Sequence, residues 1–201
     1  DPGLVDVDEL YDKMMNVYTW NDIRRDDYDV DYQNYYTFLG VLPQRELFVS
    51  TANAMLKAGD KERALKILDK CQESMPENVW PLDAIPLGFS TNDYMVVNMV
   101  SGYFAAGAPE KAAELGAKLG KELLASAHFY MEYYEYAQDE FEKSCQFLYF
   151  LVDELEKGGD KKVSAELKHS LVTLLRAGAE AYDQDYGNEA DSTVAEDTSA
   201  K

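Results

Sequence analysis

An acidic stretch near the N-terminus has the residue types and spacing of a calcium-binding loop. Asp27, Asp29 and Asp31 alternate as the first ligands of such a loop do. The sixth position of the loop needs a glycine and the twelfth needs a bidentate glutamate, but Tyr32 and Phe38 occupy them. We therefore interpret the stretch as a solvated acidic loop, and we predict that the chain binds no metal.

The two histidines are the other candidates for acid–base chemistry. Neither His128 nor His169 has a Cys or a second His at metal-ligand spacing. Ser170 directly follows His169, but adjacent helical residues face different directions and cannot act as base and nucleophile. GxSxG, HExxH, CxxC and phosphate-binding glycine motifs are also missing from the sequence. We predict that this chain is not an enzyme and uses no cofactor.

Tyrosines gather in the segment 128–136, HFYMEYYEY. Tyr130, Tyr133, Tyr134 and Tyr136 span more than half of a helix circumference, so some of them must be exposed or line a groove. Rings with a polar tip are favoured at protein interfaces and at sugar-binding surfaces. The alternative is ordinary helix packing in a chain that has 15 tyrosines.

The elements that position these residues are best seen in residues 45–76, RELFVSTANAMLKAGDKERALKILDKCQESMP. Gly59 marks a break between two helices, and Pro76 closes the unit. This is the tetratricopeptide pattern, in which small side chains let two antiparallel helices approach closely. Such a unit must stack on neighbours to bury its apolar face. Its small residues are Ala52, Ala64 and Cys71, and its large apolar residues are Phe48, Met55 and Leu68.

Two further copies of the unit follow, aligned on Gly107 and Gly159. The second helix of the middle copy is rich in alanine and glycine, so a neighbouring backbone must come close to it. We predict an all-α fold, a right-handed α-α superhelix of tetratricopeptide-like helix pairs. The repeats are expected at about 44–76, 93–124 and 138–182.

The repeats are expected to form one domain over residues 1–182. A helix from Val7 to Tyr18 and an extended crossing segment occupy 7–43, and a proline-rich loop carrying Trp80 separates the first two repeats. The pattern indicates one long helix from about 127 to 158, with a break near 138–139 left open. The polar, acidic tail 183–201 is predicted to be disordered.

Repeats of this kind bind peptides along a groove lined by their first helices. The groove lacks the Lys/Arg/Asn clamp that captures a peptide carboxylate, so a free C-terminus is not the expected ligand. Carried over by position, the groove residues are Glu46, Val49, Asn53, Leu56 and Lys57 in the first repeat, and Tyr94, Val97, Ser101, Phe104 and Ala105 in the second.

The charge of the chain excludes several classes of partner. Its 38 acidic and 19 basic residues leave a net charge of −19, which repels nucleic acid and anionic lipid headgroups. This acidity either keeps the protein soluble or offers a surface to cationic partners. The chain contains no apolar run long enough for a membrane span. It begins with Asp1 rather than Met, and we expect it to be a piece of a longer protein.

Several features spread over about residues 5–175 recur together in one known family. They are Tyr18 and Trp20, the Asp/Tyr crossing segment, the run LFVSTANAMLKAGDKERALKILDKCQESMP, the residues Pro76, Pro81 and Asp83, and YFAAGAPEKA. With these features the chain resembles the soluble C-terminal part of a Bacteroidetes-type family of multi-spanning membrane proteins of unknown function, similar to protein O-mannosyltransferases. It departs from the family at Asn21, where a glycine often follows the tryptophan.

The resemblance implies that a missing N-terminal region carries the membrane spans and any transfer of lipid-linked sugars. It implies that this domain lies on the periplasmic side of the inner membrane and has no catalytic residue of its own. The leading hypothesis is a domain that binds a protein partner or presents a substrate. The alternative is a glycan- or glycopeptide-binding module that uses the surface of Tyr130, Tyr133 and Tyr134 together with the Trp80 loop.

Overall fold

The structure is a computed structural model that describes residues 6–20, 24, 25, 27, 41–83 and 91–196. These residues form helices and turns, with no strand among them, so the predicted all-α class is confirmed. None of the helices in these ranges has the length and apolar character needed to cross a bilayer. The elements in chain order are α1 (Val7–Asp12), η1 (Lys13–Val17), α3 (Val41–Lys57), α4 (Lys61–Ser74), α5 (Thr91–Ala106), α6 (Pro109–Glu132), α7 (Tyr134–Gly158) and α8 (Lys161–Glu196).

Six of these helices form three pairs, and one turn geometry joins the helices of each pair. Gly59, Gly107 and Gly159 sit at these turns with φ angles of 82°, 86° and 89°. A side chain is strained in this left-handed conformation, which explains why glycine recurs there. In each turn the residue after the glycine donates its backbone N–H to a carbonyl five residues earlier, at 2.9–3.0 Å. The glycine breaks predicted from the sequence are therefore confirmed.

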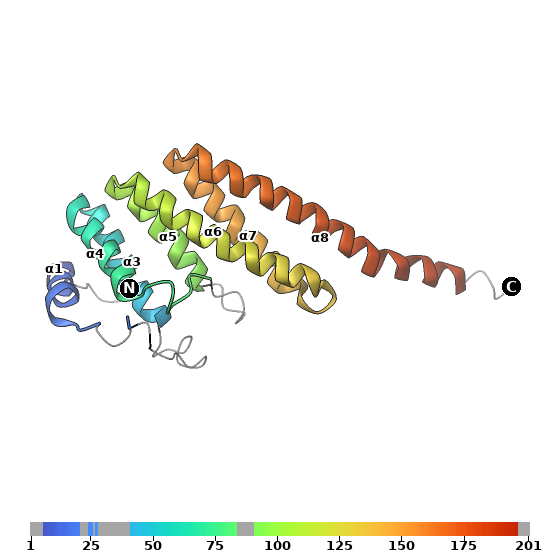
Figure 1. Ribbon diagram of the computed structural model, residues 1–201, viewed down its shortest axis with the longest axis horizontal. Coiled ribbons are helices and arrows are strands. Elements are labelled where there is room, and N and C mark those ends of the chain that lie inside the picture. Colours follow the sequence, from blue (N-terminus) through green and yellow to red (C-terminus); the bar gives the residue numbers. More distant parts are fainter. Residues whose placement is uncertain (1–5, 21–23, 26, 28–40, 84–90, 197–201) are drawn as a thin grey trace.

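The pairs stack into two layers. The first helices α3, α5 and α7 pack side by side, and each following first helix also contacts the second helix of the pair before it. Figure 1 shows the pairs succeeding one another along the molecule, with α8 extending beyond them. Fully buried residues lie between the layers, so each pair covers the apolar face of the one before it. They include Phe48, Leu68, Leu115, Leu123 and Leu148.

Small residues allow this close packing. Ala52, Ala64 and Ala112 are fully buried, as the repeat pattern predicts. On α6, a Cβ added to Gly116 would lie 2.9 Å from Leu155 Cδ2 of α7. The close neighbour at Gly116 is thus a leucine side chain of the next pair, not the neighbouring backbone that the sequence predicts.

The N-terminal helix is shorter than the sequence predicts. The α-helix ends at Asp12, and Lys13–Val17 continue as a π-helical turn in which Tyr18 N donates to Lys13 O at 2.8 Å. The wider turn accompanies the full burial of Met14, which lies 3.6 Å from Thr51 Oγ1 of α3. Most of the crossing segment lies outside the described residues, including all of 28–40. Residues 84–90 of the proline-rich loop also lie outside them.

The expectation of one continuous helix over 127–158 is wrong, whereas the break left open near 138–139 has a counterpart in a kink one residue earlier. Residues 127–132 belong to α6, Tyr133 breaks the helix with φ −120° and ψ 33°, and Ala137 adds a kink within α7. The break lets α7 fold back along α6, against which it packs. No glycine or proline marks this turn, which is why the sequence pattern did not reveal it.

The repeat boundaries shift accordingly. The first helix of the first repeat begins at Val41 rather than 44, the second repeat extends to Glu132, and the third begins at Tyr134. α8 is bounded by Lys161 and Glu196 and so includes residues 183–196 of the tail, whose disorder stays a prediction. Continuing an established helix adds one hydrogen bond per residue without a new nucleus. Residues 197–201 of the predicted tail lie outside the described residues.

The close contact at α6 can be tested with Gly120→Val. A Cβ at Gly120 would lie 2.6 Å from Leu167 Cδ2 of α8, so we expect a loss of about 1–3 kcal/mol of unfolding free energy from overpacking. The matched control is Ala117→Val at an exposed position of the same helix, where only helix propensity changes, by about 0.5 kcal/mol. Urea denaturation followed by circular dichroism measures the unfolding free energy of both variants. An equal loss of unfolding free energy in Gly120→Val and Ala117→Val would contradict this packing.

Candidate binding surfaces

The shared turn geometry gives the three pairs a common register. Alignment on Gly59, Gly107 and Gly159 makes residues at the same distance from each glycine equivalent. The predicted groove residues can therefore be compared between neighbouring first helices.

Some of the predicted groove residues are accessible and some are not. Glu46 is exposed, and so is Tyr94, its equivalent on α5. Val49 and Val97 are buried in the core, because α3, α5 and α7 pack side by side at that position, so neither is placed to contact a ligand. The other predicted groove residues divide in the same way: Lys57 and Ala105 are exposed, and the partly buried ones are Asn53, Leu56, Ser101 and Phe104.

Phe104 has a second role at the edge of the stack. It lines a pocket of about 260 Å³ between the turns of the second and third pairs. A Cβ added to Gly158 would lie 2.4 Å from the ring of Phe104, so this ring packs directly on the α7 backbone. Its exposed part is correspondingly small, and we regard it as a structural contact of the two pairs.

Trp80 is buried, so the Trp80 loop is not an exposed aromatic site for a sugar. The loop is held from α3 by Arg45, which is itself buried. Arg45 Nη1 donates to Pro81 O at 2.9 Å, and Arg45 Nη2 donates to Trp80 O at 2.7 Å. Buried guanidinium groups need such acceptors, since an unpaired buried charge costs several kcal/mol.

The same loop is held from α6 by two side chains. Glu122 Oε2 accepts from the backbone N–H groups of Leu82 at 2.7 Å and Asp83 at 2.9 Å, and the Ser126 hydroxyl donates to the Asp83 carboxylate. Burial raises the pKa of the Glu122 carboxyl, while the two N–H bonds lower it. Sequence reasoning missed this cluster because no motif joins the α3, loop and α6 residues. Its groups are paired with one another, which makes it a structural clamp for the loop.

The tyrosine-rich segment is divided by the α6–α7 turn. Tyr130 and Tyr134 are buried, whereas Tyr133 is half-exposed and Tyr136 is almost fully exposed. The ring of Phe129, also exposed, lies 5.1 Å from the ring of Tyr133. The prediction that some of these rings must be exposed is thus correct for Tyr133 and Tyr136, and the packing alternative is correct for Tyr130 and Tyr134.

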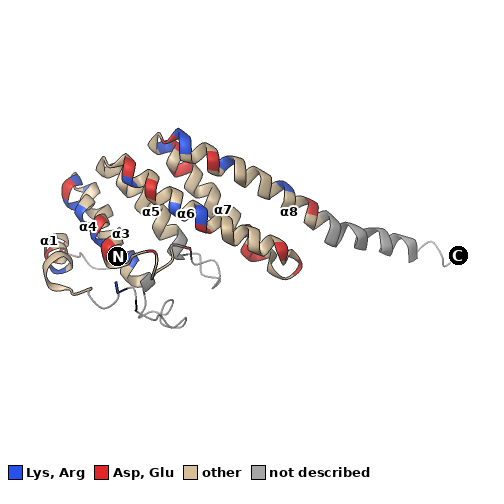
Figure 2. Cartoon of the chain, in the orientation of Figure 1, with Lys and Arg blue, Asp and Glu red and all other residues tan. Residues whose placement is uncertain are grey.

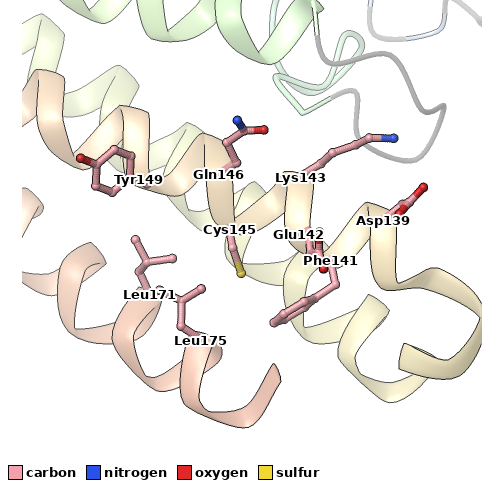
Figure 3. A pocket seen from close by; sticks show the side chains of 9 residues that line it. All are labelled: Asp139, Phe141, Glu142, Lys143, Cys145, Gln146, Tyr149, Leu171 and Leu175. Carbon is pink, nitrogen blue, oxygen red and sulfur yellow. The ribbon is translucent and has the colours of Figure 1, made fainter. Parts of the chain in front are cut away.

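A further groove, which sequence reasoning missed, lies between α7 and α8. It encloses about 660 Å³. Figure 3 shows Cys145 and Phe141 of α7 directed toward α8, and Leu171 and Leu175 of α8 directed toward α7. Its other lining residues are Asp139, Glu142, Lys143, Gln146 and Tyr149. The alignment of the three repeats on their glycines could have revealed this groove, because it places Tyr149 at the position that Val49 and Val97 occupy in the first two pairs.

Two kinds of reactive group bear on catalytic and metal chemistry: side chains that could hold a metal ion, and the two cysteine thiols. Among the described residues, no group of three or more His, Cys, Asp or Glu side chains is placed to hold a metal ion. Burial raises the pKa of the Cys71 thiol to about 12 and that of Cys145 to about 11, which disfavours the nucleophilic thiolate.

The charged residues are interspersed along the outer surface. Figure 2 shows acidic and basic residues alternating along α4, α6 and the first part of α8. Ion pairs join successive pairs of helices: Lys111 Nζ of α6 lies 2.6 Å from Asp69 Oδ1 of α4. Exposed pairs of this kind contribute at most about 1 kcal/mol each.

No protein-family model, curated protein or solved structure matches this chain. The resemblance to the mannosyltransferase-like family therefore stays a prediction, carried by the motifs quoted from the sequence.

The loop clamp makes stability depend on pH through Glu122. Its pKa is raised above the ordinary 4.5, so the folded protein binds this proton more readily than the unfolded chain does. Relative to Glu122→Gln, the wild type should lose unfolding free energy as pH rises from 4.5 through the raised pKa. Urea denaturation across this range measures the difference, with Glu132→Gln on the exposed face of α6 as the control. Parallel pH curves for the wild type and Glu122→Gln would contradict the raised pKa.

Proposed function

We propose that this chain is a non-catalytic helical repeat domain that binds a segment of a partner protein along the layer of α3, α5 and α7. The proposal includes a right-handed, tetratricopeptide-like superhelix. Three identical glycine turns and the side-by-side packing of the first helices support that arrangement.

The observation that carries the proposal is a row of accessible side chains at equivalent positions of the three first helices. Glu46, Tyr94 and Gln146 are equivalent in the register, and all three are exposed. Because α3 packs against α5 and α5 packs against α7, we infer that these three side chains form one strip across adjacent helices.

A second row runs beside the first. Asn53, Ser101 and Asp153 are equivalent to one another and partly exposed. Amide, hydroxyl and carboxylate groups at regular intervals suit the backbone N–H and C=O groups of an extended peptide. The ring of Tyr94 adds a place for an apolar side chain. The strip therefore favours a polypeptide ligand.

The resemblance is the basis for a proposal about the larger protein that contains this domain. We propose that the domain is appended to a membrane glycosyltransferase-like protein on the periplasmic side, where it recruits a partner or presents a protein substrate. In that arrangement the transfer chemistry belongs to the membrane region, and this domain supplies recognition.

Photo-crosslinking tests where the partner binds. With p-benzoylphenylalanine at position 94 of the chain in its native cell, we expect a discrete crosslinked polypeptide. The matched control carries the same group at Lys121, exposed on the second-helix layer. Tyr94→Gln should weaken binding of the crosslinked partner about tenfold, a loss of roughly 1.4 kcal/mol. Equal crosslinking at 94 and 121 would contradict the assigned surface.

The exposed rings at the α6–α7 turn support glycan or glycopeptide binding as a second candidate. Phe129 and Tyr133 form an exposed aromatic pair with ring centroids 5.1 Å apart. Adjacent rings present an apolar surface against which a sugar ring can stack, with the tyrosine hydroxyl free to hydrogen-bond at its edge.

Tyrosine fluorescence and glycan arrays test this candidate. If the surface binds sugars, titration with mannose oligosaccharides changes the intrinsic fluorescence, and Tyr133→Ala removes that change. Tyr182→Ala, an exposed tyrosine on α8, is the control and should leave the response intact. A glycan response that persists in Tyr133→Ala would rule this surface out.

A further inference from the structure

The two ends of the stack differ. At the N-terminal end, α1 and η1 cover the first pair: Met14 is fully buried, and the Trp20 ring lies 5.1 Å from the Phe48 ring. The Arg63 guanidinium of α4 lies 5.4 Å from the centre of the Tyr11 ring and pairs with Asp8. At the other end, no helix in the described part of the chain follows α8.

The repeat register shows what is uncovered at the second end. Leu175 of α8 is equivalent to Met75 after α4 and to Leu123 of α6. Met75 is 3% exposed and Leu123 is 0% exposed, whereas Leu175 is 52% exposed. A large apolar residue thus occupies the same position in all three pairs, and only the last one faces solvent.

The first helix of the last pair shows the same difference. Tyr149 of α7 is equivalent to Val49 of α3 and Val97 of α5. The two valines are 3% and 2% exposed, while Tyr149 is 60% exposed. Tyr149 and Leu175 both line the groove between α7 and α8.

In the first two pairs, a helix fills the corresponding groove. α5 packs against α3 and α4, where Cys71 Sγ lies 3.9 Å from Met99 Sδ. α7 packs in the same way against α5 and α6, with Leu155 over Gly116. The groove between α7 and α8 therefore corresponds to the position that the next first helix fills in the earlier pairs.

The size of the open groove limits its occupant. The lining residues on α7 run from Asp139 to Tyr149, about 15 Å along the helix at 1.5 Å per residue. Beyond them, near the turn, Lys168 Nζ of α8 binds Glu156 Oε1 of α7 at 2.7 Å and makes that part polar. An occupant of about three helical turns fits the apolar part.

The charges indicate which kind of helix fits. Asp139 and Glu142 stand at the rim with a single lysine, Lys143, and the whole chain carries −19. A second copy of the chain also carries a net charge of −19 and is repelled, whereas a basic segment is attracted to the acidic rim. Charge complementarity thus favours a foreign, cationic helix over self-association.

We propose that the groove between α7 and α8 binds a basic amphipathic helix of about three turns from another polypeptide, which packs as the next first helix of the stack. Its apolar face covers Tyr149, Leu171 and Leu175, and its Lys or Arg residues lie beside Asp139 and Glu142. The groove meets the strip on α3, α5 and α7 at Gln146. The residues that carry this proposal, Tyr149, Leu171 and Leu175, lie outside the strip, so the proposal does not depend on that function.

A designed peptide pair tests the proposal on the full chain. Both peptides have 11 residues, about three helical turns, and copy the apolar spacing of Val96, Met99, Val100 and Tyr103 of α5. One carries lysines at its other positions, and the second carries glutamates. Fluorescence anisotropy measures their binding to the wild type, to Leu175→Gln, to Tyr149→Gln and to the control Tyr94→Gln. Circular dichroism verifies that each variant is folded.

We expect the lysine peptide to bind the wild type and Tyr94→Gln alike, and to bind each groove variant about tenfold more weakly. The glutamate peptide should bind the wild type at least about tenfold more weakly than the lysine peptide, a gap that narrows in Asp139→Asn/Glu142→Gln. Unchanged binding in both groove variants overturns the site, and equal binding of the two peptides overturns the charge preference. A wild-type dimer that Leu175→Gln makes monomeric, seen by sedimentation, assigns the groove to a second copy and overturns the proposed partner.

Discussion

The apolar face of each helix pair is the constraint on which this structure depends. Two antiparallel helices bury the residues between them, but the outward positions of the pair remain open until another helix covers them. In this chain α5 covers the first pair and α7 covers the second, at positions such as Leu68 and Leu123. Burial of this surface is the main favourable term in folding, so every pair depends on its successor. At the two ends of the stack no further helix pair of the described residues covers this apolar face. At the first pair it is covered by α1 and η1 instead.

Close approach of the pairs requires small residues, and exact repetition of the turn keeps the pairs in register. Gly116 and Gly120 leave room for leucines of the third pair. The left-handed glycines terminate each first helix at the same point, so equivalent side chains fall into rows across α3, α5 and α7. The proposed binding strip thus depends on the same geometry that stabilises the fold.

The loop between the first two pairs interrupts this regular arrangement and is secured by buried polar groups. Arg45 binds its carbonyls from one side, and Glu122 binds its N–H groups from the other. Such a network orders the loop while satisfying groups that would be costly to bury alone. Trp80 is held in the core as a consequence, which removes it from any ligand surface.

The proposed functional surfaces are the parts that the stack leaves uncovered. The strip on the first helices, the aromatic pair at the α6–α7 turn and the groove at the last pair are all accessible parts of an otherwise closed core. Burial holds the Cys71 thiol in its neutral form and so disfavours nucleophilic chemistry at that residue. The net charge of −19 is the basis on which cationic partners are proposed.

The amino-acid sequence by itself determined the helical class, the pairing of helices and the positions of the three glycine turns within the pairs. These are local properties: apolar spacing sets a helix face, and glycine is needed where the backbone is left-handed, as at Gly59 and Gly159. Burial of Ala52 and Ala64 also followed, since the repeat pattern states which positions are in contact.

Only the tertiary structure decided the rest. The break at Tyr133 has no local signal and arises because α7 packs back along α6. The burial of Val49 and the exposure of Tyr149 are opposite outcomes at equivalent positions, because one has a following helix and the other has none among the described residues. Whether a side chain is core or surface depends on what packs against it, and that neighbour is set by the whole fold rather than by the spacing of residues along one helix.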